Sequence, residues 1–355
     1  MLVAAALAAG VLISHWPFWQ RAWQWQVAVD GWPGVLPGPT YRLRGGADAL
    51  LLDFEAAPLP SAAADGDTHL LLWASADGRG SAFLAPGYSV DSPVEGRGLV
   101  PGLLAPLYGL LTAKHPGLLD RAVSHWIPRW QSDDRGLITP RQLLWGLSGF
   151  PAGSFQPLNP ASRRAQLASG PDFDRAVRHW PQTWPAGSHF EMSPANPQLL
   201  ALVAARETGV RYAQLLEEKL WSQLASADAR AILDHARGNI AAHCCFTAAA
   251  ADWLRLGLML ADDGRIGSRQ LLPAGFISEM AVDSPVHPGF GLGYRVADFP
   301  GSGRVLVLES AGRQLLVAPQ LRRALLWVGT GPAPAGLHQL LGAETATMVD
   351  ATVTQ

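Results

Sequence analysis

Strand-forming patterns lie near both ends of this chain, and helical patterns fill the region between them. Apolar and β-branched runs bounded by turn residues predict strands at 49–54, 69–74 and 81–84, and again at 292–296, 305–308, 314–317 and 324–328. A chain with strands at both ends and helices in the middle can bury both in an α/β (α+β) architecture. The pattern therefore predicts one antiparallel sheet flanked by helices, with a helical subdomain.

The helical segments have recognisable start and stop signals. Residues 198–208 follow Pro197, which suits a first helical turn, and Gly209 suits a helix end. Residues 212–224 continue as a second amphipathic helix. Thr247 is a candidate N-cap for a third helix that Gly264 would end.

Composition indicates a folded protein and excludes several functions. The chain has 355 residues, 48% hydrophobic and 16% charged, which suits one large domain or two lobes. A formal net charge of −2 gives no electrostatic basis for nucleic-acid binding. We find no phosphate loop, no zinc helix and no complete dinucleotide fingerprint, so we expect no cofactor.

Five ordered segments resemble a known family. They are Phe83-Leu-Ala-Pro-Gly-Tyr88 with Asp91-Ser-Pro93; Ser124-His-Trp-Ile-Pro-Arg-Trp130 with Asp134-Arg-Gly-Leu-Ile-Thr-Pro-Arg-Gln-Leu-Leu144 and Ser148-Gly-Phe150; Phe190-Glu-Met-Ser-Pro-Ala-Asn196; Cys244-Cys-Phe-Thr247 with Asp252-Trp-Leu-Arg-Leu-Gly257; and Gly312-Arg-Gln-Leu-Leu-Val-Ala-Pro319. In this order they resemble the serine β-lactamases and penicillin-binding proteins, especially the 6-aminohexanoate-dimer hydrolase branch. The resemblance spans residues 45 to 331 and implies a β-lactamase/transpeptidase-like fold.

The resemblance also implies a nucleophile that this chain lacks. In the family a Ser-x-x-Lys pair opens the central helix, and its serine is acylated. Carried onto this sequence, the serine position is Gly98 and the lysine position is Pro101. The two lysines of the chain, Lys114 and Lys219, are preceded three residues earlier by leucine. No register of this sequence therefore supplies the pair.

The other catalytic positions also differ from the family. The tyrosine of the second motif corresponds to Met192, and Arg313 replaces glutamine in the late strand, where Ala311 replaces histidine. A shift of one residue would bring Ser310 near the pocket. We expect a persistent but more apolar pocket, and its candidate binding residues are Gly98, Met192, Ser193, Ser310, Gly312 and Arg313. Arg313 either offers a fixed cation at the rim or is a solvated strand arginine.

Two functions of different classes follow from these substitutions. The first is a membrane-tethered, non-catalytic binding or scaffolding protein whose ligand is a small amphipathic acid or the chain end of a protein partner. The second is an active esterase or amidase with a rebuilt site that uses Ser310, Ser193, or Cys245 with His243. The adjacent cysteines Cys244 and Cys245 are interpreted as two thiols, and their spacing with His243 does not suit a metal site.

Two prolines predict a change at the start of the central helix. Pro101 is tolerated in a first turn, but Pro106 inside a continuous helix would remove a hydrogen bond at a cost of about 3 kcal/mol. We therefore expect the helix to begin near Pro106, with residues 98–105 forming a loop.

The N-terminal residues predict a membrane tether. Residues 1–13 are uncharged and apolar, and tryptophans follow at 16, 19, 23 and 25. An uncleaved anchor, a signal peptide and a buried helix all fit this pattern. We expect residues 1–28 to form the anchor or signal-like segment, 29–44 a linker, 45–335 the β-lactamase-like domain and 336–355 a C-terminal helix or tail. The domain would then face the periplasm or the cell exterior.

Overall fold

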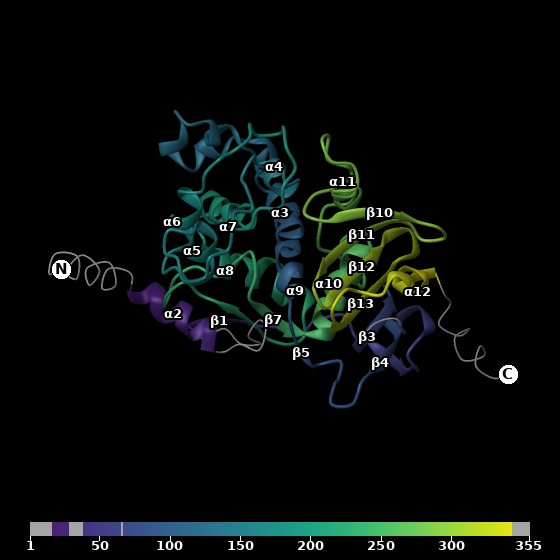
Figure 1. The fold of residues 1–355 in the computed structure, drawn as a ribbon. Coiled ribbons are helices and arrows are strands. Elements are labelled where there is room, and N and C mark those ends of the chain that lie inside the picture. Colours follow the sequence, from purple (N-terminus) through teal and green to yellow (C-terminus); the bar gives the residue numbers. More distant parts are fainter. Residues whose placement is uncertain (1–15, 28–37, 65–66, 343–355) are drawn as a thin grey trace.

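The fold is built on a seven-stranded sheet, seen in a computed structural model that describes residues 16–27, 38–64 and 67–342 (Figure 1). Its strand order is β10-β11-β12-β13-β3-β4-β2, and neighbours are antiparallel except for β2 and β4. The strands are β2 (Asp53–Ala56), β3 (Asp67–Ser75), β4 (Arg79–Leu84), β10 (Arg295–Phe299), β11 (Gly303–Ser310), β12 (Arg313–Ala318) and β13 (Arg323–Thr330). The four consecutive C-terminal strands are confirmed. The expected antiparallel sheet is mixed at one edge, because β2 pairs in parallel with β4.

A second sheet of four strands lies beside the first. Its order is β1-β6-β7-β5, and all its pairs are antiparallel. The strands are β1 (Thr40–Leu43), β5 (Pro93–Glu95), β6 (Ala229–Ile232) and β7 (Phe246–Ala249); β8 (Arg265–Ile266) and β9 (Arg269–Gln270) form a separate pair. No local pattern in the sequence predicted this sheet, and β1 lies within the predicted linker 29–44.

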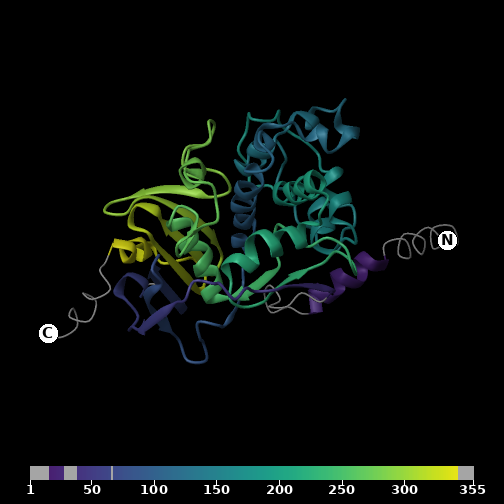
Figure 2. The same cartoon turned by 180° about the vertical axis from the view of Figure 1, so that it is seen from behind.

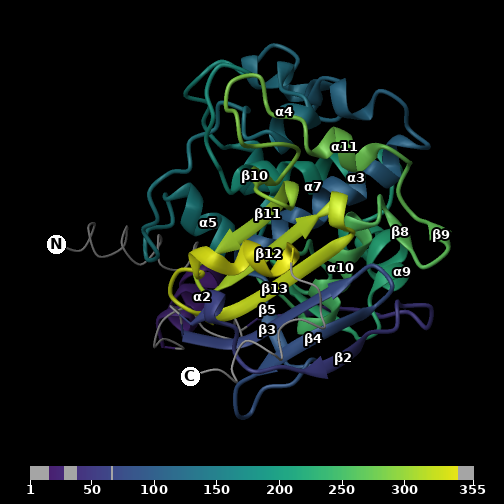
Figure 3. The ribbon, with the colours of Figure 1, turned by 90° about the vertical axis from the view of Figure 1, so that its right-hand side faces the viewer.

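Helices cover both faces of the large sheet (Figures 1 and 3). On one face lies α10 (Ala250–Ala261), which contacts β12, β13 and β3 and buries Trp253 completely. On the other face, η9 (Ala335–His338) and α12 (Gln339–Gly342) pack over a cluster that includes Trp73 and Trp327. Thr247 belongs to β7, so the helix begins at Ala250, three residues after its expected N-cap.

The remaining helices form a lobe next to the sheet (Figure 2). They are α3 (Leu104–Thr112), α4 (Pro140–Leu144), α5 (Arg163–Ser169), α6 (Phe173–Arg178), α7 (Ala195–Thr208), α8 (Tyr212–Leu215), a π-helical turn (Leu216–Trp221) and α9 (Ser222–Leu224). The short helix α11 (Phe276–Met280) stands beside β10, at the sheet side of the molecule (Figure 1). The predicted end of α7 is confirmed, because Gly209 has a left-handed φ of 71°. Four short 3-10 turns connect α3 to α4, at Leu118–Asp120, Val123–His125, Pro128–Trp130 and Asp134–Leu137; two others, at Ser61–Ala63 and Pro319–Leu321, connect strands β2 to β3 and β12 to β13.

The central helix begins close to the expected place, but what precedes it is not a loop. Residues Arg97–Leu103 form the 3-10 helix η2, which continues directly into α3 at Leu104. Pro106 is the third residue of α3, and the carbonyl of Gly102, four residues earlier, accepts a hydrogen bond from Tyr294 Oη (2.8 Å) instead of from the N–H that proline lacks. The helical conformation of 98–105 therefore corrects the loop prediction.

The helix α2 (Trp16–Val27) packs against the domain. Phe18 and Ala22 are buried with Ala165 of α5. The guanidinium of Arg21 donates hydrogen bonds to the carbonyls of Leu233, Asp234 and Gly170. None of the helices in the described ranges is long and apolar enough to cross a membrane. The apolar residues 1–15 on which the tether prediction rests, and 343–355 of the predicted tail, lie outside the described ranges.

Candidate functional site

The nucleophile position of the family lies where η2 meets the end of β11. A Cβ atom built on Gly98 would lie 2.8 Å from the Cβ of Ser310 and 2.9 Å from the carbonyl oxygen of Glu309. Real Cβ atoms essentially never approach other heavy atoms within 3.0 Å. Strand β11 therefore occupies the space that a side chain at position 98 needs.

Ser310 lies next to Gly98 at the end of β11. Its Oγ is buried and has no hydrogen-bond partner among the described residues. A serine nucleophile needs a base within hydrogen-bond reach to accept its proton. The neighbouring Gly312 forms the turn between β11 and β12 with a φ of 77°, and a Cβ there would lie 2.4 Å from the carbonyl oxygen of Gly329. Gly312 thus has a structural reason to be glycine.

A small cavity, here called the inner cavity, opens beside this junction. Its volume is about 170 Å³, and its apolar wall consists of Pro101, Leu104, Leu143, Leu144, Met192, Pro194, Pro197, Leu200 and Gly293. Four polar side chains complete it: Arg164, Ser193, Asn196 and His243. Met192 is 53% exposed. The structure therefore brings together Pro101, Met192 and Ser193, as the resemblance implies.

Three of these four polar groups are already engaged within the protein. Arg164 Nη1 donates to the carbonyl of Gly153 at 3.5 Å. Ser193 Oγ donates to the carbonyl of Pro151 (3.0 Å) and accepts from the N–H of Ala195 (3.3 Å). Asn196 Oδ1 accepts from Ser148 Oγ at 2.6 Å. Ser193 is therefore held as a structural hydroxyl beside the helix start, and its proton points to a carbonyl oxygen.

His243 is the buried titratable group of the inner cavity. Burial lowers the pKa of His243 to about 4, and the nearby charge of Arg164 acts in the same direction. The imidazole is therefore neutral at neutral pH. Its Nδ1 is buried and has no hydrogen-bond partner in the described part of the chain. The cavity thus contains one neutral imidazole with an unpaired nitrogen and one cation.

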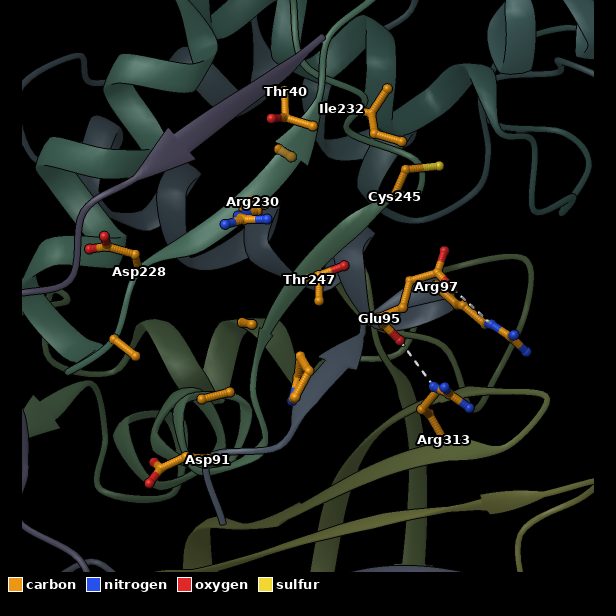
Figure 4. Close-up of a pocket in the computed structure, with 15 residues that line it drawn as sticks. Thr40, Asp91, Glu95, Arg97, Asp228, Arg230, Ile232, Cys245, Thr247 and Arg313 are labelled. Carbon is orange, nitrogen blue, oxygen red and sulfur yellow. Dashed lines mark hydrogen bonds and ion pairs between the residues drawn. The ribbon is translucent and has the colours of Figure 1, made fainter. Parts of the chain in front are cut away.

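Arg313 lies in a different depression, here called the outer groove (Figure 4). The groove has a volume of about 560 Å³ and runs over one face of the small sheet, with Arg97 and Glu95 at the same end as Arg313. Arg313 Nε donates to the carbonyl of Glu95 (3.0 Å), and Nη1 donates to the carbonyl of Gly312 (3.1 Å). The six candidate binding residues therefore do not form one site. Gly98, Ser310 and Gly312 line neither depression.

Cys244 and Cys245 form a disulfide between adjacent residues. The interpretation as two thiols is therefore wrong. The turn before β7, with Cys245 at a left-handed φ of 67°, places the two sulfur atoms together. Cys245 lines the outer groove whereas His243 lines the inner cavity, so they do not form a nucleophile–base pair. In the described part of the chain no cluster of three metal-ligating side chains occurs.

Sequence reasoning missed Arg164 and Asn196 as cavity residues. Asn196 stands within the segment that resembles the family's second motif, two residues after the expected third member, Pro194. Arg164 lies on α5, outside every motif, and reaches the inner cavity through the packing of α5. No local signal marks Arg164, because its position depends on contacts between distant segments.

The chain belongs to the Beta-lactamase family, which it matches over residues 110–343. This match begins after Gly98 and Pro101, so the segment that would hold the nucleophile lies outside it. No curated protein sequence matches the chain.

Solved structures show the same fold at low identity. A provisionally assigned 6-aminohexanoate-dimer hydrolase from Bacillus anthracis has a TM-score of 0.70 and 16% identity, covering 85% of this chain and 88% of that protein. EstCE1, a hydrolase with promiscuous acyltransferase activity, has a TM-score of 0.57 and 17% identity, covering 79% of this chain and 94% of that protein. A penicillin-binding-protein homologue from Caulobacter crescentus has a TM-score of 0.55 and 16% identity, covering 77% of this chain and 89% of that protein. The β-lactamase/transpeptidase-like fold expected from the sequence is confirmed.

Proposed function

We propose that this protein is a non-catalytic member of the serine hydrolase family that binds a small amphipathic acid in the inner cavity. The observation that carries the proposal is the contact at Gly98. Strand β11 approaches this residue so closely that the usual nucleophile position has neither a side chain nor space for one. A hydrolase of this family needs an acylated serine at that position.

The chemistry of the inner cavity supports an acid with a small apolar body. Its 170 Å³ volume is close to that of an engineered apolar cavity of about 150 Å³ that binds benzene. Arg164 offers a guanidinium that matches the geometry of a carboxylate. A structural neighbour holds a ligand of similar size: it is a D-amino acid amidase complexed with L-phenylalanine, an acid with a small apolar side chain. The chain end of a partner protein would present the same carboxylate.

We also propose that residues 1–28 tether the domain to a membrane, facing the periplasm or the cell exterior. The apolar start and the run of tryptophans support this proposal. Fractionation of cells that express the full chain tests it. Full-length protein found wholly in the soluble fraction, with an intact N-terminus, would refute the tether.

Calorimetric titration of the full chain with phenylalanine, hexanoate and 6-aminohexanoate tests the ligand class. We expect saturable binding of at least one acid, weakened about tenfold or more by Arg164→Gln, since one charge-assisted bond contributes about 1.5–3 kcal/mol. Arg163→Gln is the matched control, because Arg163 is the neighbouring exposed arginine and does not line the inner cavity. Equal binding by both variants would exclude Arg164 as the carboxylate partner.

A rebuilt hydrolase is the second candidate, and the buried hydroxyl of Ser310, which has no hydrogen-bond partner among the described residues, favours it. A fluorophosphonate probe separates the two functions, because it labels an activated serine. We expect no labelling of the unmodified protein. Labelling of Ser310 that Ser310→Ala abolishes would make the protein an enzyme. A complementary assay measures ester and amide hydrolysis after Gly98→Ser, Pro101→Lys and Met192→Tyr are introduced together.

A further inference from the structure

The outer groove carries an arrangement of charges that the proposed function does not use. Arg97 and Arg313 lie at one end, and Asp91 and Asp228 lie away from them in Figure 4. Glu95 is 7% exposed and, of the three carboxylates among the described residues that line the groove, is the one at the arginine end. Asp228 is paired with Arg42, outside the groove. The carboxylate of Glu95 pairs with Arg97, whereas Arg313 bonds the backbone carbonyl of Glu95, so two guanidinium groups lie near one carboxylate at this end.

The pairing of these groups leaves donors free. Arg97 Nε lies 3.5 Å from Glu95 Oε2, and Nη1 donates to the carbonyl of Ala311 at 3.3 Å. Arg313 donates hydrogen bonds from Nε to the carbonyl of Glu95 and from Nη1 to the carbonyl of Gly312. Each guanidinium carries five N–H donors in a fixed fork. Neither arginine therefore uses all its donors on described residues.

The electrostatics indicate an excess of positive charge. Burial lowers the pKa of Arg313, and the positive charge of Arg97 lowers it further. Two cations held together in a half-buried place repel each other, and a bound anion would remove that cost. Arg230, on the same face, has no ion-pair or hydrogen-bond partner among the described residues. The hydroxyl of Thr247 lies between Arg230 and the end of the groove that holds Arg97 (Figure 4).

We propose that this end of the outer groove binds an oxyanion, a phosphate or carboxylate group of a small solute or of a lipid headgroup, between Arg97 and Arg313. Hydrogen bonds to backbone carbonyls orient both guanidinium groups before the anion binds. Little side-chain entropy is then lost on binding. The groove is separate from the inner cavity, and the proposal does not depend on the ligand of that cavity.

The arrangement predicts opposite effects for two neutralising substitutions. Arg313→Gln removes one of the two guanidinium groups and should weaken anion binding about tenfold or more, because a charge-assisted hydrogen bond is lost. Glu95→Gln removes the carboxylate that pairs with Arg97 and whose negative charge acts on Arg313, and it should strengthen anion binding several-fold. A residue that served only to hold the fold would not strengthen binding when replaced. Arg79→Gln is the matched control, because Arg79 pairs with Asp77 on an exposed hairpin.

Calorimetric titration of the full chain with inorganic phosphate and with acetate, at constant ionic strength set by chloride, measures these effects. Cosedimentation with phosphatidylglycerol vesicles, against phosphatidylcholine vesicles, tests the headgroup source. Binding of either free ion, or of anionic vesicles alone, with the opposite shifts in the two variants, supports the site and distinguishes its source. If Arg313→Gln does not fold, Arg97→Gln replaces it. Absence of saturable binding to all probes, or unchanged binding in every variant, overturns the proposal.

Discussion

Replacing Gly98 with alanine is expected to lower the free energy of unfolding, because strand β11 occupies the place of the new methyl group. The added Cβ would lie 2.8 Å from the Cβ of Ser310 and 2.9 Å from the carbonyl oxygen of Glu309. Neither atom is the far end of a flexible side chain, so the contact cannot be relieved by a rotamer change. The backbone or the strand must shift.

The size of the effect follows from two opposing terms. Overpacking of a well-packed site costs about 1–3 kcal/mol. Alanine in place of glycine also restricts the unfolded chain, which contributes about 0.4–1 kcal/mol of stability where the backbone conformation is compatible. Gly98 does not have a positive φ, so this gain applies. We expect a net loss of about 1–2 kcal/mol.

Urea unfolding followed by tryptophan fluorescence measures this difference, with Gly342→Ala as the control. A Cβ at Gly342 would meet no atom within 4 Å, so that variant should show only the gain of about 0.4–1 kcal/mol from the restricted unfolded chain. The double variant Gly98→Ala with Ser310→Gly should show a favourable coupling energy of about 1 kcal/mol, because the second change removes one of the two contacts. If Gly98→Ala is as stable as the unmodified protein, the close approach of β11 is refuted, and the main support for a non-catalytic site is lost.

Three further predictions concern other parts of the molecule. Phe18→Ala should loosen α2, since truncating a buried phenylalanine costs about 3–5 kcal/mol, and faster hydrogen exchange in α5 would report it; unchanged exchange would mean that α2 does not dock there. Because the pKa of His243 is about 4 in the fold and 6.5 ordinarily, the unfolded chain binds a proton between these values that the folded chain does not. The free energy of unfolding should therefore fall as the pH drops from about 6.5 to 4, by up to about 1.4 kcal/mol per pH unit, and not further below pH 4. The variant His243→Gln should lose this part of the pH dependence of the free energy of unfolding. If the unmodified protein and the variant show the same pH dependence in unfolding curves at pH 7, 5.5 and 4.5, a neutral buried imidazole is contradicted. Finally, alkylation of denatured, unreduced protein should modify neither Cys244 nor Cys245, while mass spectrometry after reduction should find both modified; modification without reduction would contradict the disulfide.

Much of the architecture could be predicted from local patterns. The four C-terminal strands, the end of α7 at Gly209 and the family resemblance all follow from periodicity, turn residues and motif order. These signals are local, because apolar spacing and backbone preference act within a few residues. The absence of a Ser-x-x-Lys pair is likewise a property of the sequence alone.

Tertiary packing decided the remainder. Two roles for Arg313 were compatible with the sequence, and only the fold turns its guanidinium toward the carbonyl of Glu95, far away in the chain. The closure of space at Gly98 depends on β11, more than 200 residues later. The parallel pairing of β2 with β4 and the docking of α2 through Arg21 are likewise contacts between separate segments. Residue types and spacings set which elements form, whereas the direction of a side chain and the space around it depend on partners that the local sequence does not specify.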